Sequence, residues 1–370
     1  MKSVIFILTM SIFVILSCKF KENSGSTVDN IRAFSDTIGY AHKGYQMDSV
    51  MSRINRLYGR ERKNILFIHD MPSPKNWKIV ICPHDDYSYA GEIYPYVLEN
   101  LKTPTIIIFG VAHQAKDFGI EDQLVFDSFT HWEGPYGPVK VSEYREALLA
   151  EIPSEMYQIN DSLQQIEHSV EALIPFIQYY YPAVEIVSIL VPYMKYQRME
   201  EIAIPLARAL ENIMEERQLI WGRDFSIAIS NDCVHYGDQS WGGKKYAPFG
   251  ADSAGYRAAT NYDMNIISEC LIDQVEPQRI RRFFEYTVDV NNYKEYAWTW
   301  CGRYSVPFGL LCGFHLQNLL GNTPLEGRML RYATSLRGKR VQVEDLDMKV
   351  NAPATMHHWV GYVAIGYTEP

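Results

Sequence analysis

The chain has 370 residues, of which 47% are hydrophobic and 21% charged, a balance typical of globular proteins and unlike that of disordered chains. The length is sufficient for one large domain or two smaller ones with a sizeable core. The formal net charge of −9 leaves no broad cationic surface, which argues against nucleic acid and anionic lipid headgroups as partners.

The N-terminus has the pattern of an export signal. Lys2 is followed by two apolar runs, and Ser17 stands directly before Cys18. The apolar stretch is shorter than the ~20 residues of a transmembrane helix. The sequence Ile-Leu-Ser-Cys that ends at Cys18 resembles a bacterial lipobox, which implies cleavage before Cys18 and lipidation of its thiol. An uncleaved signal anchor is the alternative.

We therefore expect a signal peptide over residues 1–17, then a lipidated Cys18 with a polar tether over residues 18–40. The lipid would hold an exported protein at the membrane of a bacterial cell envelope. Five further cysteines remain, and no Cys-x-x-Cys motif occurs. An odd number without that spacing supports neither a disulfide scaffold nor a zinc ribbon.

Alternating strand and helix patterns follow. Short apolar, β-branched runs predict buried parallel strands at residues 79–81, 105–109, 185–191 and 225–229. Apolar residues at helical spacing predict one helix with the stripe Ile166, Val170, Leu173, Ile174 and Ile177, and another with Ile204, Leu206, Ala207, Leu210 and Ile213. This alternation predicts an α/β fold with a central, mostly parallel sheet covered by helices on both faces.

The C-terminal part differs from the rest of the chain. Residues 330–334 and 359–365 read as two more strands, which we expect to pair at a sheet edge. No linker divides the mature chain, so we expect a single domain over residues 41–370.

Polar clusters follow three of the predicted strands. They are residues 82–91 with His84, residues 110–113 with His113, and residues 230–237 with Asp232 and His235. Ligands of open α/β sheets bind outside the carboxyl ends of the strands, and neighbouring strands lie ~4.8 Å apart. We therefore expect these side chains to converge on one site.

Two converging imidazoles suit a divalent transition metal. Two His and a carboxylate form the facial arrangement of non-haem Fe(II), whereas two His with a thiolate or carboxylate and water suit Zn²⁺. Each residue also has a plainer interpretation. A lone His after a strand is often a surface or hydrogen-bonding residue, Asp232 can be a turn residue, and His235 can act in proton transfer or only orient a neighbour.

Two other clusters carry reactive residue types. His168 is two residues from Ile166 and off the apolar stripe, so the pattern alone places it on a solvated helix face. Arg303 follows Cys301 and Gly302, and it either anchors a substrate carboxylate or pairs with a surface acid.

Six motifs occur in a fixed order. They are Pro83-His84-x-x-Tyr87-x-Tyr89-x-Gly91, Gly110-x-x-His113, Glu133-Gly134-Pro135-Tyr136-Gly137, Glu167-His168-Ser169-x-Glu171-x-x-x-Pro175-Phe176, Ser230-x-Asp232-x-x-His235-Tyr236-Gly237 and Cys301-Gly302-Arg303. From about residue 75 to the C-terminus, this set resembles the MEMO-like family, whose bacterial members are often called AmmeMemoRadiSam system protein B.

The resemblance implies a fold similar to the LigB-type class III extradiol dioxygenases, with a metal pocket at the strand ends. It implies that His84 and His113 are metal ligands, for Fe(II) first and Cu or Zn as alternatives, and that the chemistry is redox or oxygenase-type. By family analogy, AMMECR1-like and radical SAM proteins are possible partners. The substrate would be a small molecule that the resemblance does not name.

Two departures from the family affect the site. Asp85 and Asp86 replace the usual Ala-Gly, and these two added carboxylates could join the metal shell or supply a base. Val234 stands where animal members have a Cys, and Cys233 lies one residue earlier, which turns its side chain to the opposite face of an extended segment. Asp232 is therefore the third ligand that we expect.

The remaining roles follow from the matched motifs. We expect His168 or His235 to move protons, with Asp86 as a further catalytic group, and Tyr89, Glu167 and Arg303 to contact substrate. A metal-dependent redox enzyme is the first hypothesis. A zinc-dependent hydrolase and a non-catalytic lipoprotein that captures a metal or small ligand are the alternatives.

Overall fold

The computed structural model describes residues 30–36, 38–68, 77–239 and 245–370. The expected signal peptide, Cys18 and the tether up to residue 29 lie outside these residues. The strands are β1 (Ile31–Arg32), β2 (Ile79–Cys82), β3 (Thr105–Val111), β4 (Leu124–Phe126), β5 (His131–Trp132), β6 (Val139–Val141), β7 (Tyr157–Ile159), β8 (Glu185–Val191), β9 (Phe225–Ser230), β10 (His235–Gly237), β11 (Asp273–Gln274), β12 (Glu326–Thr334) and β13 (His358–Thr368).

Helices alternate with these strands along the chain. They are α1 (Gly44–Ile68), α2 (Tyr87–Ala90), α3 (Tyr94–Leu98), α4 (Tyr144–Glu151), α5 (Asp161–Ile166), α6 (His168–Glu171), α7 (Ile174–Tyr180), α8 (Tyr196–Arg217), α9 (Ser253–Ile266), α10 (Pro277–Thr287) and α11 (Ser305–Leu319), with short turns η1 (Ser154–Met156), η2 (Ile267–Leu271) and η3 (Glu344–Leu346). Among the described residues, no helix is both long and apolar enough to cross a bilayer.

One large sheet organises the fold. Its main path runs β1-β5-β6-β8-β3-β9-β2-β13-β12-β11. The central neighbours from β6 to β2 are parallel, whereas β13 and β12 are antiparallel to the strands beside them. All four predicted central strands are present, and the predicted mostly parallel α/β fold is confirmed.

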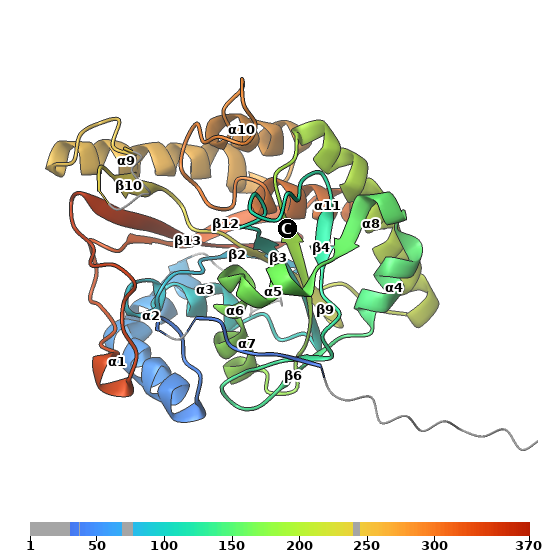
Figure 1. The fold of residues 1–370 in the computed structure, drawn as a ribbon, viewed down its shortest axis with the longest axis horizontal. Helices are drawn as coiled ribbons and strands as arrows, with labels where there is room; N and C mark the ends of the chain where they lie inside the picture. The colour runs from blue at the N-terminus through green and yellow to red at the C-terminus, as the bar shows by residue number, and fades with distance from the viewer. Residues whose placement is uncertain (1–29, 37, 69–76, 240–244) are drawn as a thin grey trace, which may run out of the picture.

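Helices cover both faces of the sheet, because its central strands are apolar on both sides. In β2, Ile79 and Ile81 belong to the core that contains the buried faces of α8 and α11. Val80 and Cys82 belong to the opposite core, with residues of α1, α3 and α7. Figure 1 shows these two helical layers, with α8, α10 and α11 on one side and α1, α3 and α7 on the other.

The two C-terminal strands pair as expected, near the end of the sheet where only the two-residue β11 follows β12. β12 and β13 run antiparallel over most of their lengths, and β13 also pairs with β2 in the middle of the sheet. The residues just before α1 are ordered as well. β1 pairs with β5 in parallel, and the side chain of Arg32 is buried. The stretch assigned to the tether therefore becomes part of the sheet from Ile31.

The single helix expected from the stripe at 166–177 is wrong. The chain instead forms α5, α6 and α7, with a break at Glu167, whose backbone is extended at φ −84° and ψ 124°. Pro175 stands in the first turn of α7, where its missing N–H costs nothing, and it disfavours continuation of the preceding helix. Because α6 starts anew at His168, this side chain is redirected. It lines a cavity, into which its side chain remains 41% exposed.

Candidate metal centre

His84 follows β2 and presents one ring nitrogen to the centre of the site. Its Nδ1 lies 2.7 Å from Oγ of Ser230, and that hydroxyl donates to the carbonyl of Ser169 at 2.6 Å. Since the serine proton is used, the serine oxygen accepts and Nδ1–H of His84 donates. Nε2 is then left with a lone pair, and it is buried without a hydrogen-bond partner.

His113 follows β3 and is oriented in the same way by a carboxylate. Its backbone N–H and its Nδ1 lie 2.8 Å and 2.9 Å from the two carboxylate oxygens of Glu167. An ionised carboxylate only accepts, so Nδ1 carries the proton and Nε2 the lone pair. A carboxylate that holds the far nitrogen of a His is the usual partner of a metal-ligating imidazole.

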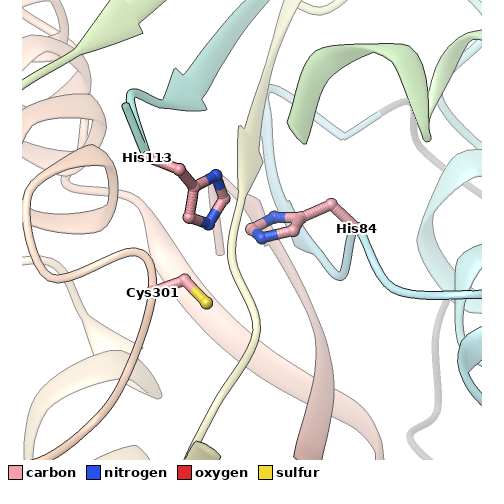
Figure 2. Close-up of side chains that lie close together, drawn as sticks. All are labelled: His84, His113 and Cys301. Atoms are coloured by element: carbon pink, nitrogen blue, oxygen red, sulfur yellow. The ribbon is translucent and has the colours of Figure 1, made fainter. Parts of the chain in front are cut away.

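Cys301 is the third candidate metal ligand, beside His84 and His113. Nitrogen atoms of His84 and His113 and the Sγ of Cys301 all lie within 4.8 Å of one another. Figure 2 shows both rings and the thiol directed toward one point, from the ends of β2 and β3 and from the loop before α11. Cys301 is buried and free, as are Cys82, Cys233, Cys270 and Cys312, so no disulfide joins Cys82 to Cys233.

Asp232 and His235 also lie close to this thiol. Nε2 of His235 is 2.7 Å from Sγ of Cys301, and Oδ2 of Asp232 is 3.9 Å from that nitrogen and 3.5 Å from Nε2 of His84. Asp232 also accepts the backbone N–H of His84 at 3.0 Å. The ligand-like group that contains both His84 and His113 is thus completed by Cys301, whereas Asp232 groups with His235 and Cys301.

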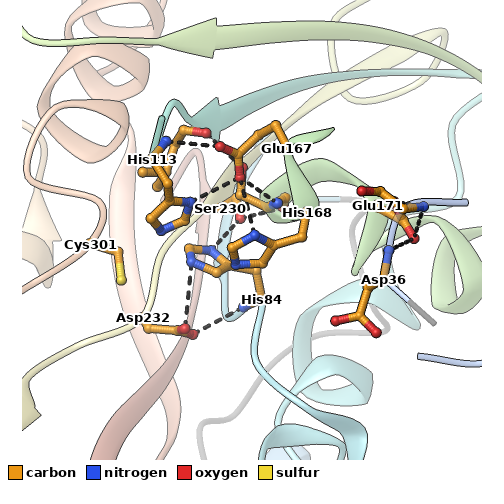
Figure 3. A network of polar contacts seen from close by, with 12 residues as sticks. Asp36, His84, His113, Glu167, His168, Glu171, Ser230, Asp232 and Cys301 are labelled. Carbon is orange, nitrogen blue, oxygen red and sulfur yellow. Dashed lines mark hydrogen bonds and ion pairs between the residues drawn. The ribbon is translucent and has the colours of Figure 1, made fainter. Parts of the chain in front are cut away.

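Glu167 has the role of orienting His113. Both its oxygens are used by His113 and by the N–H of Ser169, and its side chain is 1% exposed. Burial alone would raise the pKa of Glu167, but His113 beside it, the hydrogen bonds and His168 hold this pKa at about 2. This carboxylate does not line the cavity of the site. Figure 3 shows how His113 and His168 flank it.

A cavity of about 250 Å³ opens beside the two histidines. Four of the six residues for which we expect proton transfer or substrate contact line its wall, as do Asp85 and Asn351. These four are His168, His235, Asp86 and Tyr89. The ring of His168 stacks on that of His113, with centroids 4.6 Å apart and an interplanar angle of 13°.

Asp86 is buried behind Asn351, which donates its backbone N–H and its side-chain amide to the carboxyl at 2.6 Å and 2.8 Å. Burial and the neighbouring Asp85 raise the pKa of Asp86 to about 8. Tyr89 accepts the N–H of Ala354 at 3.0 Å through its hydroxyl, and the rest of its side chain faces the cavity.

Burial favours the neutral form of three imidazoles and one thiol at the site. Burial lowers the pKa of His84 well below its ordinary value, and that of His168 to about 4 and of His235 to about 3, with neighbouring imidazoles adding to the effect. Burial raises the pKa of the Cys301 thiol, helped by Asp232. Neutral imidazoles are the form that binds metal, whereas the thiol must lose a proton to do so.

These donors fit a transition-metal ion. The Nε2 lone pairs of His84 and His113 converge with the thiol of Cys301. The Nε2 of His84 is buried without a hydrogen-bond partner, which costs free energy unless a ligand binds it. Arg303, which we expected to contact substrate, lies outside the 250 Å³ cavity, in a smaller one behind His113 and Cys301.

Sequence reasoning did not select Cys301 as a ligand, although it lies in a motif of the set. The available signal was a thiol directly before Gly302, whose missing side chain lets the loop approach Asn231. A Cβ at that position would lie 2.4 Å from Oδ1 of Asn231. Such a close approach fixes the backbone beside Cys301.

Comparisons with known proteins identify relatives of this chain. The profile of the family described as Memo-like protein matches residues 59–344. A MEMO1 family protein of Pyrococcus furiosus is 28% identical over 265 residues, which cover 70% of this chain and 80% of that protein. One of Pyrococcus horikoshii is 26% identical over 268 residues, or 70% and 81% of the two chains.

A further relative matches over a shorter length. A MEMO1 family protein of Saccharolobus islandicus is 29% identical over 161 residues, which cover 42% of this chain and 52% of that protein. The profile match contains the candidate metal ligands His84, His113 and Cys301. The chain therefore belongs to the Memo-like protein family.

Proposed function

We propose that this protein binds one transition-metal ion through His84, His113 and Cys301 and uses it for redox chemistry on a small molecule. The observation that carries the proposal is the pair of tautomers fixed by Ser230 and Glu167. Both direct an Nε2 lone pair toward the same thiol. A plain hydrogen-bonding role for His84 would not leave its Nε2 buried and unpaired.

The donor set favours a soft or borderline cation. Thiolate ligands select Cu(I), Zn or Fe, and imidazole suits Cu, Zn and Fe. The Fe(II) arrangement expected from two His and one carboxylate needs Asp232, which lies 3.5 Å from Nε2 of His84 and within reach of a fourth position. When bound, the ion would supply a redox-active centre beside the cavity.

The residues around the ion would handle protons. His235, with its Nε2 2.7 Å from the thiol, is placed to pass the proton that Cys301 loses on to solvent when metal binds, because its low pKa prevents it from keeping that proton. Asp86, protonated near neutral pH because burial raises its pKa to about 8, can donate from the cavity wall. Neutral His168 on the same wall can accept.

The cavity favours catalysis over simple metal capture. A site that only stores an ion has no need of about 250 Å³ of space lined by five imidazoles and three carboxyl groups. Hydrolysis at zinc remains the competing chemistry, because two His and a Cys with an open position also occur in catalytic zinc sites.

Metal analysis tests this function. We expect near-stoichiometric metal in the anaerobically purified protein and its loss in His84→Ala, His113→Ala and Cys301→Ser. His315→Ala, which alters another partly buried imidazole on α11, is the matched control and should keep full metal content. Equal metal content in all four variants would refute the assignment. Stoichiometric zinc instead of iron or copper would redirect the chemistry to hydrolysis.

We also propose that the protein is exported and lipidated at Cys18. What supports this is the basic start, short apolar stretch and lipobox-like sequence before that residue. Cells labelled with a radioactive fatty acid should incorporate it into the wild type and not into Cys18→Ala. Unchanged labelling of the variant would contradict the proposed anchor.

A further inference from the structure

Arg303 is a buried cation without an acidic partner among the described residues. Its side chain is 4% exposed, and no described carboxylate forms an ion pair with it. The other two buried arginines behave differently, because Arg32 pairs with Glu171 and Arg145 with Asp127. A buried charge normally requires a counter-ion, so the exception needs an explanation.

The groups around Arg303 do not neutralise it. Nη2 donates to the carbonyl of Lys294 at 3.0 Å, whereas Nε is buried without a hydrogen-bond partner. The guanidinium carbon lies 3.4 Å from the ring centroid of Tyr296 and 4.9 Å from that of Tyr304. Aromatic faces attract a cation, but they carry no net charge. The guanidinium is therefore held in position and still lacks an anion.

The unpaired guanidinium lines a cavity of about 50 Å³. His113 and Cys301 line the same cavity, and His113 also lines the larger one. About 10–15 Å³ of such space suffices for one water molecule, so this cavity has room for a group of about three heavy atoms. That is the size of a carboxylate, which also matches the planar fork of a guanidinium.

We propose that this small cavity is a carboxylate-binding subsite, with Arg303 as the counter-ion. The assignment of the carboxylate to the substrate rests on the function proposed above, whereas binding of the anion itself does not. A carboxylate held by Arg303 lies against His113 and Cys301, so the rest of a substrate would extend toward the metal ligands. A free small carboxylate would present the same chemistry without that extension.

Calorimetric titration of sodium formate into the full chain in detergent tests the subsite, with metal-free and metal-loaded samples at constant ionic strength. We expect saturable binding in both samples, weakened about tenfold or more in Arg303→Gln, because a charge-assisted hydrogen bond is lost. Arg281→Gln is the matched control, since Arg281 stacks over Tyr196 at 4.4 Å on an exposed helix face and should leave binding unchanged.

Several results would overturn the subsite. These are absence of saturable formate binding in the wild type, equal binding in Arg303→Gln, and binding that occurs only in metal-loaded samples and survives Arg303→Gln. The last would make the anion a metal ligand. If Arg303→Gln does not fold, Arg303→Lys keeps the charge, loses the planar fork and should still bind formate more weakly.

Metal content of the same samples separates this inference from the proposed function. Formate binding in a protein that takes up no metal would support the subsite and refute the metal centre. Bound metal without formate binding would support the metal centre and refute the subsite. Titration with benzoate then distinguishes a substrate carboxylate from a free small anion. A subsite for a substrate should bind benzoate, with its ring directed toward the metal ligands. A site for a free anion should bind formate alone.

Discussion

Nδ1 of His113 lies 2.9 Å from a carboxylate oxygen of Glu167, and the second oxygen of the same group accepts the backbone N–H of His113. One buried carboxylate thus holds both the ring and the backbone of a candidate ligand. The break between α5 and α6 places Glu167 there, because its extended backbone lets the side chain turn back toward the end of β3.

Glu167→Gln should weaken metal binding by about 10–100-fold, the usual cost of changing the partner of a ligating His. The amide nitrogen of Gln is a donor and would face one of the three N–H groups that now share the carboxylate. Competition with a chromophoric chelator measures the affinity. Glu99→Gln, at a half-exposed ion pair with Arg62, is the control and should leave the metal affinity unchanged.

Ser230→Ala should lower metal affinity about tenfold, because the hydroxyl that fixes the tautomer of His84 is lost. Ser226→Ala on the same strand is matched in burial and removes a hydroxyl that donates to the carbonyl of Trp77. This control variant should lose stability but keep its metal affinity. Equal metal affinities of the two variants would show that the Ser230 hydroxyl does not orient His84.

Metal affinity should rise with pH by about tenfold per unit between pH 6 and 8, with release of about one proton per ion. The sign follows from the thiol, since burial raises the pKa of Cys301 and metal must displace its proton. His84 contributes no proton in this range, because burial lowers its pKa well below the ordinary value. Titration in buffers of different ionisation enthalpy counts the protons, and Cys301→Ser should abolish most of the slope.

As the pH rises from about 4 to about 8, the wild type should lose stability relative to Asp86→Asn, by at most about 1.4 kcal/mol per unit. Burial and Asp85 raise the pKa of Asp86 to about 8, so in this range the folded state holds a proton that the unfolded state has lost. Asp86→Asn carries no proton and should lack this contribution. Urea unfolding at several pH values measures the difference, and parallel curves for the two proteins would contradict the raised pKa.

Arg32→Met should destabilise the fold by about 3–5 kcal/mol, because it leaves the buried carboxylate of Glu171 without its partner. Adding Glu171→Gln should recover part of this loss. Arg53→Met, at the exposed pair with Asp345, should cost about 1 kcal/mol or less. Urea unfolding midpoints compare the three variants.

Metal affinity of the same Arg32→Met variant is informative as well. Nη2 of Arg32 donates to the backbone carbonyl of Glu167 at 2.8 Å, so its loss should loosen the segment that orients His113. A variant that loses stability but keeps the full affinity would show that Glu167 is held by other contacts.

The central strands could be predicted because they are buried on both faces, which makes their sequences continuous apolar runs. The convergence of His84, His113, Asp232 and His235 followed from the same sheet, since parallel strands end at one edge. The break at Glu167 could not be predicted from the stripe, because the helical spacing continues through it. Its cause is tertiary, in the carboxylate bonded to His113.

Two residues that build or support the site lie in chain segments outside the predicted strands and helices. Cys301 lies in a loop before α11, and its approach depends on the contact between Gly302 and Asn231. Arg32 lies in a two-residue strand, too short to be recognised by any periodicity. Both were accessible only once the distant segments were placed in space.

The sheet order β3-β9-β2 sets β9 between the two strands that carry His84 and His113. Their separation is fixed by two ladders of backbone hydrogen bonds, and β9 itself supplies Ser230. The conformational entropy of gathering the ligands is therefore lost when the chain folds, before any ion arrives. Under the proposed function, ion uptake would then be separable from folding in time and in place, and the metal content would reflect the ions that the finished protein meets.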